Sequence, residues 1–398
     1  EKHKAMKAKS EFKDLHWQFL GPTNTSGRST NLAVVQPHAK NHTVYVATAS
    51  GGVWKTINEG ISWFPIFENE VTTSIGDVEV DPKNPETVWV GTGEANIFRS
   101  SHAGCGIYKS TDGGETWKNV GLENTNTIAR IVINPKNTDI VYVAAGGNEW
   151  TNNPERGIYK TTDGGKTWSK VLYVDEGTAA NDLIMDPKDP NTLYATTWER
   201  VREKWNDPRT LPNHKNSGIW KTTNGGKTWE QINNGLPEAK FRGRIGIDIA
   251  RSNTKVIYAL VDNYEIARTN DEGGATDSYG RPKGGIIKGA TVYRSNDKGK
   301  SWKQVSGLTE KMKAYMERHS STYGWVFAQM RVDPNDENTI YTMGLGLNIS
   351  KDGGKTFTGL RGMHGDHHGL WINPNNSQHL INVNDGGIYF SYDQGATW

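Results

Sequence analysis

The amino-acid sequence predicts an all-β protein, a seven-bladed β-propeller built from four-stranded antiparallel blades. A motif of the pattern Ser/Thr-x-Asp/Asn-x-Gly-x-Thr/Ser-Trp/Phe occurs seven times, and its copies start 54, 51, 61, 73, 55 and 41 residues apart. Repeats at such spacing are typical of propellers and solenoids, in which each repeat packs on its neighbours. The composition agrees, because 34% hydrophobic residues and 45 glycines suit short strands joined by many turns. The copies of the motif are Thr56–Trp63, Ser110–Trp117, Thr161–Trp168, Thr222–Trp229, Ser295–Trp302, Ser350–Phe357 and Ser391–Trp398.

The residue types of the motif predict a structural hairpin rather than a catalytic site. Asp or Asn at the third position can accept hydrogen bonds from nearby backbone amides, and Gly permits the positive φ of a tight turn. The final Trp is a large apolar side chain that can fill the space between adjacent sheets. Six of the 15 tryptophans occupy this position, and Phe357 occupies the seventh.

Four strands are expected in each repeat, because β-branched and aromatic residues alternate with clusters of Gly, Asn and Pro. The first strands end in a turn at Asn-Pro or Asp-Pro, as in Ser74–Pro82, Ile128–Pro135, Asp182–Pro187, Val326–Pro334 and Gly369–Pro374. The second strands are Thr43–Ala47, Thr87–Gly91, Ile140–Ala144, Thr192–Ala195, Val256–Leu260 and Thr339–Met343. The third strands lead into the motif, as in Gly106–Lys109, Gly157–Lys160 and Gly218–Lys221. The fourth strands start at the motif Trp, as in Trp117–Gly121.

The two ends of the chain predict how the ring closes. The sequence stops at Trp398, inside the seventh motif, and His16–Pro22 reads like the strand that would follow it. Pairing of this N-terminal strand with the last blade would close the ring and leave no open sheet edge. We therefore expect a charged leader over residues 1–15 and a propeller over 16–398, and we interpret the chain as a fragment of a longer, tandem-propeller protein.

Charge and hydropathy limit the partners. The net charge of +2 gives no indication of nucleic-acid binding, and no apolar run approaches the ~20 residues of a membrane span. Cys105 is the only cysteine, so no intrachain disulfide can form. The charged start indicates a mature domain whose export signal has been removed, so we expect a secreted, periplasmic or cell-surface protein.

Strand direction predicts which face of the ring carries the function. The motif hairpins and the Pro-containing turns lie on one face, since both join strands at the same end of the blade. The connections between second and third strands, and those between blades, lie on the other face. That face carries the long insertions, where binding and catalytic residues concentrate. The insertions are Glu94–Gly106, Gly147–Arg156, Glu199–Ser217, Asp262–Thr291, Gly307–Tyr323 and Gly359–Asp366.

Carboxylates, arginines and aromatic residues are expected to converge on this face. Aromatic faces stack on sugar rings, and two carboxylates at a suitable separation hydrolyse glycosidic bonds. The alternative is that the rim carboxylates pair with Arg28, Arg130 and Arg244 to tie the blades together. The candidate acids and bases are Glu94, Glu149, Glu199, Asp262 and Asp385. The candidate ligand-binding residues are Arg28, Arg244, Trp150, Trp198, Trp205, Tyr323 and Trp325.

The segment His364–His368 (HGDHH) is a candidate metal site. In an extended strand, alternate residues share a side, so His364, Asp366 and His368 would point together. Two imidazoles and a carboxylate suit zinc or another divalent metal, and Asp385 is a candidate fourth ligand. The alternative is that these side chains fill the top of the channel and bond backbone amides.

The repeated motif resembles the Asp-box (BNR) repeat of sialidases, of xyloglucan-cleaving tandem-propeller endoglucanases and of the sortilin-type VPS10 receptors. The resemblance covers nearly the whole chain as architecture. In the endoglucanases a catalytic Asp precedes Gly-Gly in the first blade, whereas this chain has Ala49-Ser50-Gly51-Gly52, so that carboxylate is absent. The second catalytic Asp of the endoglucanases belongs to their other propeller, and the Arg-Ile-Pro entry motif of sialidases is missing.

Three functions remain open at this point. The first is an extracytoplasmic, sortilin-like propeller that binds a protein, peptide or glycan on the face opposite the motif hairpins. The second is a glycoside hydrolase-like, carbohydrate-active propeller that uses the rim carboxylates as acid and base. The third is a structural module of a larger surface assembly. A large apolar patch on the loop-bearing face would favour this function or the first one.

Overall fold

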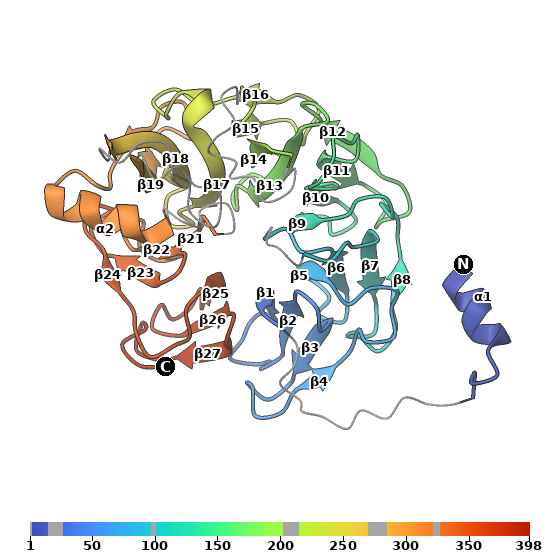
Figure 1. Cartoon of the computed structure of the whole chain (residues 1–398). Coiled ribbons are helices and arrows are strands. Elements are labelled where there is room, and N and C mark those ends of the chain that lie inside the picture. The colour runs from blue at the N-terminus through green and yellow to red at the C-terminus, as the bar shows by residue number, and fades with distance from the viewer. Residues whose placement is uncertain (1, 15–26, 97–100, 202–214, 270–284, 321–326) are drawn as a thin grey trace.

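The computed structural model describes residues 2–14, 27–96, 101–201, 215–269, 285–320 and 327–398. Its strands form seven antiparallel sheets arranged radially around a central axis (Figure 1). We number these blades I to VII in chain order. The seven-bladed β-propeller predicted from the sequence is confirmed.

The first four blades each hold four strands in sequence order from the axis outward. Blade I contains β1 (Ser29–Val34), β2 (Val44–Thr48), β3 (Val53–Thr56) and β4 (Phe64–Pro65). Blade II contains β5 (Ile75–Val80), β6 (Val88–Thr92), β7 (Ile107–Ser110) and β8 (Lys118–Asn119). Blade III contains β9 (Ile128–Ile133), β10 (Val141–Ala145), β11 (Gly157–Thr161) and β12 (Ser169–Leu172). Blade IV contains β13 (Thr178–Met185), β14 (Leu193–Glu199), β15 (Gly218–Thr222) and β16 (Glu230–Gln231).

The remaining blades follow the same order, and the seventh has three strands among the described residues. Blade V contains β17 (Arg242–Ile249), β18 (Ile257–Thr269), β19 (Gly285–Ser295) and β20 (Lys303–Gln304). Blade VI contains β21 (Gln329–Val332), β22 (Ile340–Met343), β23 (Leu347–Ser350) and β24 (Thr358–Gly359). Blade VII contains β25 (His367–Ile372), β26 (Leu380–Asn384) and β27 (Gly387–Ser391). Among the described residues, the helices are α1 (Lys2–Lys9), the 3₁₀ turn η2 (Ala239–Phe241) and α2 (Glu310–Ser320).

The ring closes where blade VII packs on blade I. Each innermost strand contacts the next one, and β25 contacts β1. Apolar side chains from both blades fill this seam, which buries Leu32, Val46, Ile381 and Val383. The closing strand predicted at His16–Pro22 lies outside the described residues.

The repeated motif forms the hairpin between the third and fourth strands, as expected. In blade III, the Asp163 carboxylate accepts hydrogen bonds from the Thr167 backbone N–H at 2.9 Å and hydroxyl at 2.7 Å, and from the Thr161 hydroxyl at 2.8 Å. These bonds to the charged form, first of all from Thr167, lower the pKa of Asp163 to about 2. Gly164 and Gly165 have φ of 70° and 94°, which is the conformation for which the motif needs glycine.

Neighbouring blades are joined by a contact that recurs around the ring. The ammonium group at the end of the third strand donates to a backbone carbonyl in the next blade's motif hairpin. Lys55 reaches Gly113 O at 2.8 Å, and Lys160 reaches Gly225 O at 2.8 Å. A tyrosine of the second strand donates to the same carbonyl, as Tyr142 does to Gly225 O at 3.0 Å. The motif hairpins therefore hold the seams as well as their own turns.

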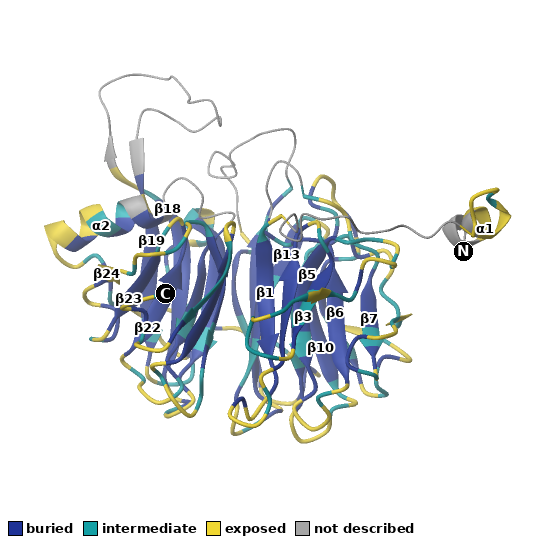
Figure 2. Cartoon of the chain, turned by 90° about the horizontal axis from the view of Figure 1, so that it is seen from below, coloured by how far each residue is buried: buried dark blue, intermediate teal, exposed yellow. Residues whose placement is uncertain are grey.

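The two faces of the ring differ as the strand directions predict. The motif hairpins and the turns between first and second strands lie on one face, here called the hairpin face (Figure 2). The longer connections and α2 lie on the opposite face, here called the loop face (Figure 2). Candidate residues on the loop face are therefore presented together.

Candidate functional site

An ion pair joins two of the residues expected at the rim of the loop face. The Arg28 guanidinium donates from both Nε and Nη2 to the two oxygens of the Glu94 carboxylate, with an Nε–Oε1 distance of 2.5 Å. The Glu94 side chain is 1% exposed and that of Arg28 is 19% exposed. Burial opposes the charge of Arg28, but the bond to Glu94 and the Glu94 and Asp385 charges outweigh it and raise the pKa of Arg28. Glu94 is thus held between blades I and II as a charged partner of Arg28.

The segment that follows Glu94 extends from blade II to blades V and VII. The Asn96 side chain accepts a hydrogen bond from Arg244 Nη2 at 2.9 Å, and its amide nitrogen lies 3.2 Å from His368 Nδ1. Arg244 lies on β17, and burial lowers its pKa to about 10. Sequence reasoning missed Asn96, because an Asn inside a loop carries no pattern that indicates a partner 272 positions away.

His368 connects this network to Asp385. Its Nε2 lies 2.8 Å from Asp385 Oδ1, and Phe327 stacks on its ring with 5.4 Å between ring centroids. Both ring nitrogens of His368 therefore have side-chain partners within the protein. Asp385 keeps a 34% exposed side chain, so it is the carboxylate of this network that solvent reaches most readily.

The HGDHH segment has a different geometry from the extended strand that we expected. Strand β25 begins at His367, and Asp366 has φ of 63°, so the alternation of side chains does not extend back to His364. His364 is exposed and its Nδ1 lies 3.0 Å from the neighbouring Gly365 carbonyl oxygen. His367 is buried beside Asn382, and burial lowers its pKa to about 4. A divalent metal bound by His364, Asp366, His368 and Asp385 stays a prediction.

The other predicted site residues have varied surroundings. Glu149 and Asp262 are buried at 6% and 1% exposure, and Glu199 accepts hydrogen bonds from the backbone N–H groups of Lys215 and Asn216. Trp150 is 38% exposed on the loop face, whereas Trp198 is 1% exposed and has the Arg200 guanidinium over its ring. Trp205, Tyr323 and Trp325 lie outside the described residues.

A buried belt of charged residues lines the axis below the rim, and sequence reasoning placed only Arg130 in its neighbourhood. Arg130 Nε donates to Asp182 Oδ1 at 3.0 Å, and Arg130 Nη1 lies 3.9 Å from Asp77 Oδ1. The two carboxylates also accept backbone N–H groups of the next blade, Asp77 from Ile131 at 2.6 Å and Asp182 from Ile247 at 3.2 Å. The signal that could have found them is an Asp flanked by apolar residues within a first strand.

Register shifts explain how these side chains reach the axis. The pairing of first and second strands shifts next to Asp77 in blade II and next to Asp182 in blade IV. A β-bulge at such a place turns the chain and re-aims the side chain that follows it. The interpretation that arginines tie the blades together describes Arg28 and Arg130 well, although Arg130 pairs with inner-strand aspartates rather than rim carboxylates.

A pocket of about 430 Å³ opens on the loop face between α2 and blade VI. Tyr315 and Asn348 are among its polar lining residues, and the Tyr315 hydroxyl donates to the Asn348 side-chain oxygen. The Asn348 amide nitrogen lies 2.7 Å from His319 Nδ1. The lining residues are Lys311, Ala314, Tyr315, His319, Leu345, Gly346 and Asn348. The pocket thus combines an apolar wall, hydrogen-bonding groups and one exposed ammonium group.

His319 at the base of this pocket predicts a loss of stability in mild acid. Burial, with a smaller contribution from the His367 charge, lowers the pKa of His319 to about 4, whereas an unfolded His titrates near 6.5. Below pH 6.5 the unfolded chain binds this proton and the folded chain does not, so stability falls between pH 6.5 and 4. We expect His319 to contribute a loss of about 2 kcal/mol between pH 7.5 and 5.

Urea unfolding at a series of pH values measures this effect, and His319→Gln removes the titrating group. The groups that face His319 are the Tyr315 hydroxyl, the Lys311 ammonium and the Asn348 amide in the pocket, and His367 from β25. The variant should show a flatter pH dependence than the native chain over this window. Parallel curves for the two proteins would contradict the assignment.

Comparisons with known proteins agree with the fold and with the motif. A family model described as "Sortilin, neurotensin receptor 3" (Sortilin-Vps10) matches residues 105–273. Xyloglucanase Xgh74A of Acetivibrio thermocellus is 26% identical over 208 residues, which cover 48% of this chain and 24% of that protein. An oligoxyloglucan-reducing end-specific xyloglucanase of Emericella nidulans is 26% identical over 277 residues, which cover 62% of this chain and 29% of that protein.

Solved structures show the same architecture at low sequence identity. The GH74 xyloglucanase of Xanthomonas campestris superposes with a TM-score of 0.63 and 15% identity, covering 96% of this chain and 54% of that one. A structure titled "YCF48 bound to D1 peptide" gives a TM-score of 0.55 and 14% identity, covering 95% of this chain and 98% of that one. The chain therefore spans about a quarter of the curated xyloglucanases and about half of the solved one, but nearly all of the YCF48 chain.

Proposed function

Since the chain is a propeller of the superfamily that contains sortilin and the GH74 xyloglucanases, we propose that it is an extracytoplasmic binding protein that holds a peptide segment of a partner on its loop face. The pocket beneath α2 is the anchor for one side chain of that segment. The exposed face of Leu345 offers apolar contact, and the exposed Lys311 ammonium favours a carboxylate in the bound segment.

The observation that carries this proposal is the engagement of the rim carboxylates. Glu94 forms an ion pair with Arg28, and Glu199 accepts hydrogen bonds from two backbone amides. Asp385 is in hydrogen-bonding contact with His368. A glycosidase needs two carboxylates that face a common substrate across about 5 to 9.5 Å. Groups already paired inside the protein suit a rigid binding rim better than an acid and a base. The YCF48 structure, which has nearly the same length, holds a peptide.

Location outside the cytoplasm is part of the proposal. By their names, the xyloglucanase relatives act on xyloglucan, and a polysaccharide substrate is met outside the cell. Within the described residues, neither helix has the length and apolar character of a membrane span.

Substitution of Leu345 tests the proposed anchor. The purified chain would be applied to an array of random peptides, and Leu345→Asp should weaken capture of the selected peptides about tenfold, because it places a charge in the apolar part of the pocket. Leu308→Asp is the matched control, because Leu308, in the connection between β20 and α2, is also exposed but does not line the pocket. Equal binding by both variants would contradict a site in this pocket.

A carbohydrate-active propeller is the second candidate, favoured by the xyloglucanase relatives and by two solvent-reachable groups. Asp385 is the most accessible carboxylate of the rim network, and the exposed Trp150 offers a ring for stacking on a sugar. Release of reducing ends from a panel of plant, algal and bacterial polysaccharides would support it, provided that Asp385→Asn abolishes the release. Release that Asp385→Asn leaves intact would move the chemistry to another carboxylate, and it would also count against a purely binding function.

A further inference from the structure

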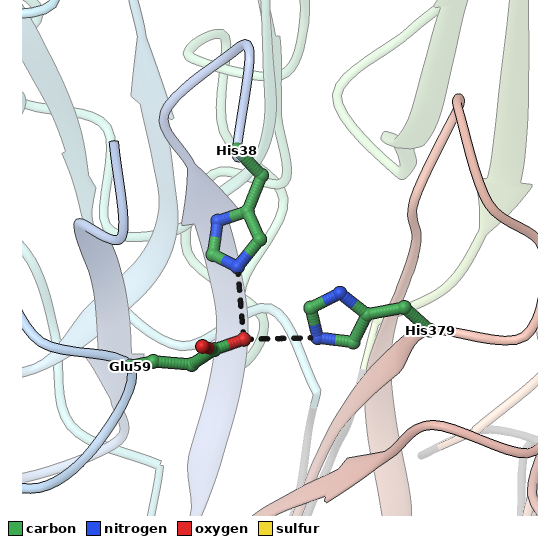
Figure 3. Close-up of side chains that lie close together, drawn as sticks. All are labelled: His38, Glu59 and His379. Atoms are coloured by element: carbon green, nitrogen blue, oxygen red, sulfur yellow. Dashed lines mark hydrogen bonds and ion pairs between the residues drawn. The ribbon is translucent and has the colours of Figure 1, made fainter. Parts of the chain in front are cut away.

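A cluster of histidines surrounds one carboxylate where blade VII meets blade I, on the hairpin face and far from the loops considered above. His38 lies in the β1–β2 turn, Glu59 in the motif hairpin of the same blade, and His379 in the β25–β26 turn of blade VII. His38 Nε2 lies 3.1 Å and His379 Nε2 lies 3.4 Å from Glu59 Oε1 (Figure 3). Residues from the first and last blades thus face one another across the closing seam.

The separations of these atoms match the ligand set of a tetrahedral metal ion. Zinc binds His nitrogen and carboxylate oxygen at about 2.0–2.2 Å, which places neighbouring ligand atoms about 3.3 Å apart. The three potential ligand atoms all lie within 4.8 Å of one another. His38 and His379 are 3% and 5% exposed. His38 Nε2 is in hydrogen-bonding contact with Glu59 Oε1, whereas His379 Nε2 has no hydrogen-bond partner among the residues that the structure describes. A buried imidazole nitrogen that points at a shared carboxylate oxygen without bonding it is in the position of a metal ligand.

The closing seam lacks the lysine contact that joins each of blades I to IV to the next blade. At most seams a lysine of the third strand and an aromatic residue of the second strand hold the next hairpin. In blade VII these two positions are taken by Phe390 and Ile381, neither of which can donate a hydrogen bond. Among the described residues, the seam between blades VII and I therefore has the histidine cluster and lacks both the lysine and the aromatic residue that hold most other seams.

The backbone of Glu59 gives a further indication that its side chain is used. Glu59 has φ of 56°, in the left-handed region where four of the seven motifs have Gly. A non-glycine residue there costs about 1 kcal/mol, so a side chain at this position is expected to make a compensating contact. Lys298 is a parallel case, since it has φ of 60° and its ammonium group lies 3.1 Å from Asp186 of the preceding blade.

Neighbouring side chains complete an enclosure with one accessible side. Trp371 packs edge-on against both His38 and His379, and Tyr392 stacks on His379 with 4.7 Å between ring centroids. His42 Nδ1 lies 3.6 Å from Glu59 Oε2, and its side chain is 50% exposed. His42 or a water molecule is thus in a position to supply a fourth ligand from the solvent side.

We propose that His38, Glu59 and His379 bind a divalent transition metal of the zinc type, which joins the first blade to the last. Two neutral imidazoles and a carboxylate are the donors that zinc accepts, and hard cations such as magnesium prefer oxygen alone. The ion replaces, at the closing seam, the lysine contact that blades I to IV make with the next blade.

Metal binding to the full chain tests the proposal. The chelator-treated protein would be titrated with Zn²⁺ by calorimetry and with Co²⁺ by visible absorption, and one equivalent with the strong absorption of tetrahedral Co²⁺ is expected. Saturating Zn²⁺ at a hundredfold excess over the Kd should raise the Tm by about 3–4 °C, because the ion binds the closed ring. Magnesium at the same concentration should not.

Variants assign the site and separate it from the other candidate. His379→Gln and Glu59→Gln should abolish the Co²⁺ absorption and the Zn²⁺-dependent shift of the Tm, with circular dichroism verifying that each variant is folded. His364→Gln, on the loop face, is the matched control and should keep both. Loss of binding in His364→Gln alone would overturn the proposal in favour of the HGDHH segment. Absence of stoichiometric uptake by the native chain would also overturn it, and would leave the cluster as hydrogen bonds that hold the seam.

Discussion

Replacing Asp182 by Ala is expected to lower the free energy of unfolding by about 3–5 kcal/mol. The carboxylate is buried and accepts bonds from Arg130 Nε at 3.0 Å and from the Leu183 and Ile247 backbone N–H groups at 3.0 and 3.2 Å. Its removal leaves the largely buried Arg130 with one of the two aspartates described above, Asp77, whose Oδ1 lies 3.9 Å from Arg130 Nη1. A largely buried guanidinium that loses its nearer, hydrogen-bonded carboxylate costs more than the pair contributes, because it cannot recover its lost hydration.

Guanidinium chloride unfolding measures this loss, and two further variants show its origin. Glu230→Ala, on the exposed strand β16 of the same blade, should change stability by less than about 0.5 kcal/mol. The double variant Asp182→Ala, Arg130→Met should be more stable than Asp182→Ala alone, because it also removes the guanidinium that has lost its hydrogen-bonded carboxylate. If the double variant is instead less stable than Asp182→Ala by the full cost of an independent Arg130→Met change, the two groups are not coupled.

Replacing Trp302 by Ala is expected to cost about 3–5 kcal/mol, the second of the two largest effects. The indole is 5% exposed in a cluster with Ile232 of blade IV, and its Nε1 donates to the Ile232 carbonyl at 2.6 Å. Truncation leaves a cavity at the seam between blades IV and V and an unpaired carbonyl oxygen. The cavity and the unpaired carbonyl both lower the free energy of unfolding.

The sixth motif supplies the comparison for this prediction, since Phe357 occupies the same position and is 6% exposed. Trp302→Phe keeps most of the apolar volume and loses the hydrogen bond, so we expect a cost of about 1–2 kcal/mol by chemical unfolding. A cost for Trp302→Phe equal to that of Trp302→Ala would mean that the bond, rather than the packing, holds the seam.

The sequence predicted the fold because the information for it is local. Each motif contains the Asp or Asn, the Gly and the Trp that form one hairpin, so the hairpins, the blade count and the two faces follow from short stretches of chain. The sequence also predicted that arginines would pair with carboxylates, although not which carboxylates Arg130 would use. Buried arginines near an axis need acidic or carbonyl partners, whichever residues supply them.

The contacts of the site depend on details that no local pattern fixes. Asn96 reaches His368 across 272 positions, and His38 reaches His379 only because the ring closes. The HGDHH prediction assumed an extended backbone, but Asp366 adopts a left-handed conformation immediately before β25. Strand alternation is a reliable guide inside a sheet and fails at the residue where the strand begins.

The segment around Asn96 has a consequence for how the ring can move. The Asn96 side chain, which follows blade II, is held by buried contacts to Arg244 of blade V and to His368 of blade VII. A concerted tilting of the blades that widened the ring would break both of these contacts at once. Adaptation to different ligands is therefore expected to come from the connections on the loop face rather than from movement of the blades.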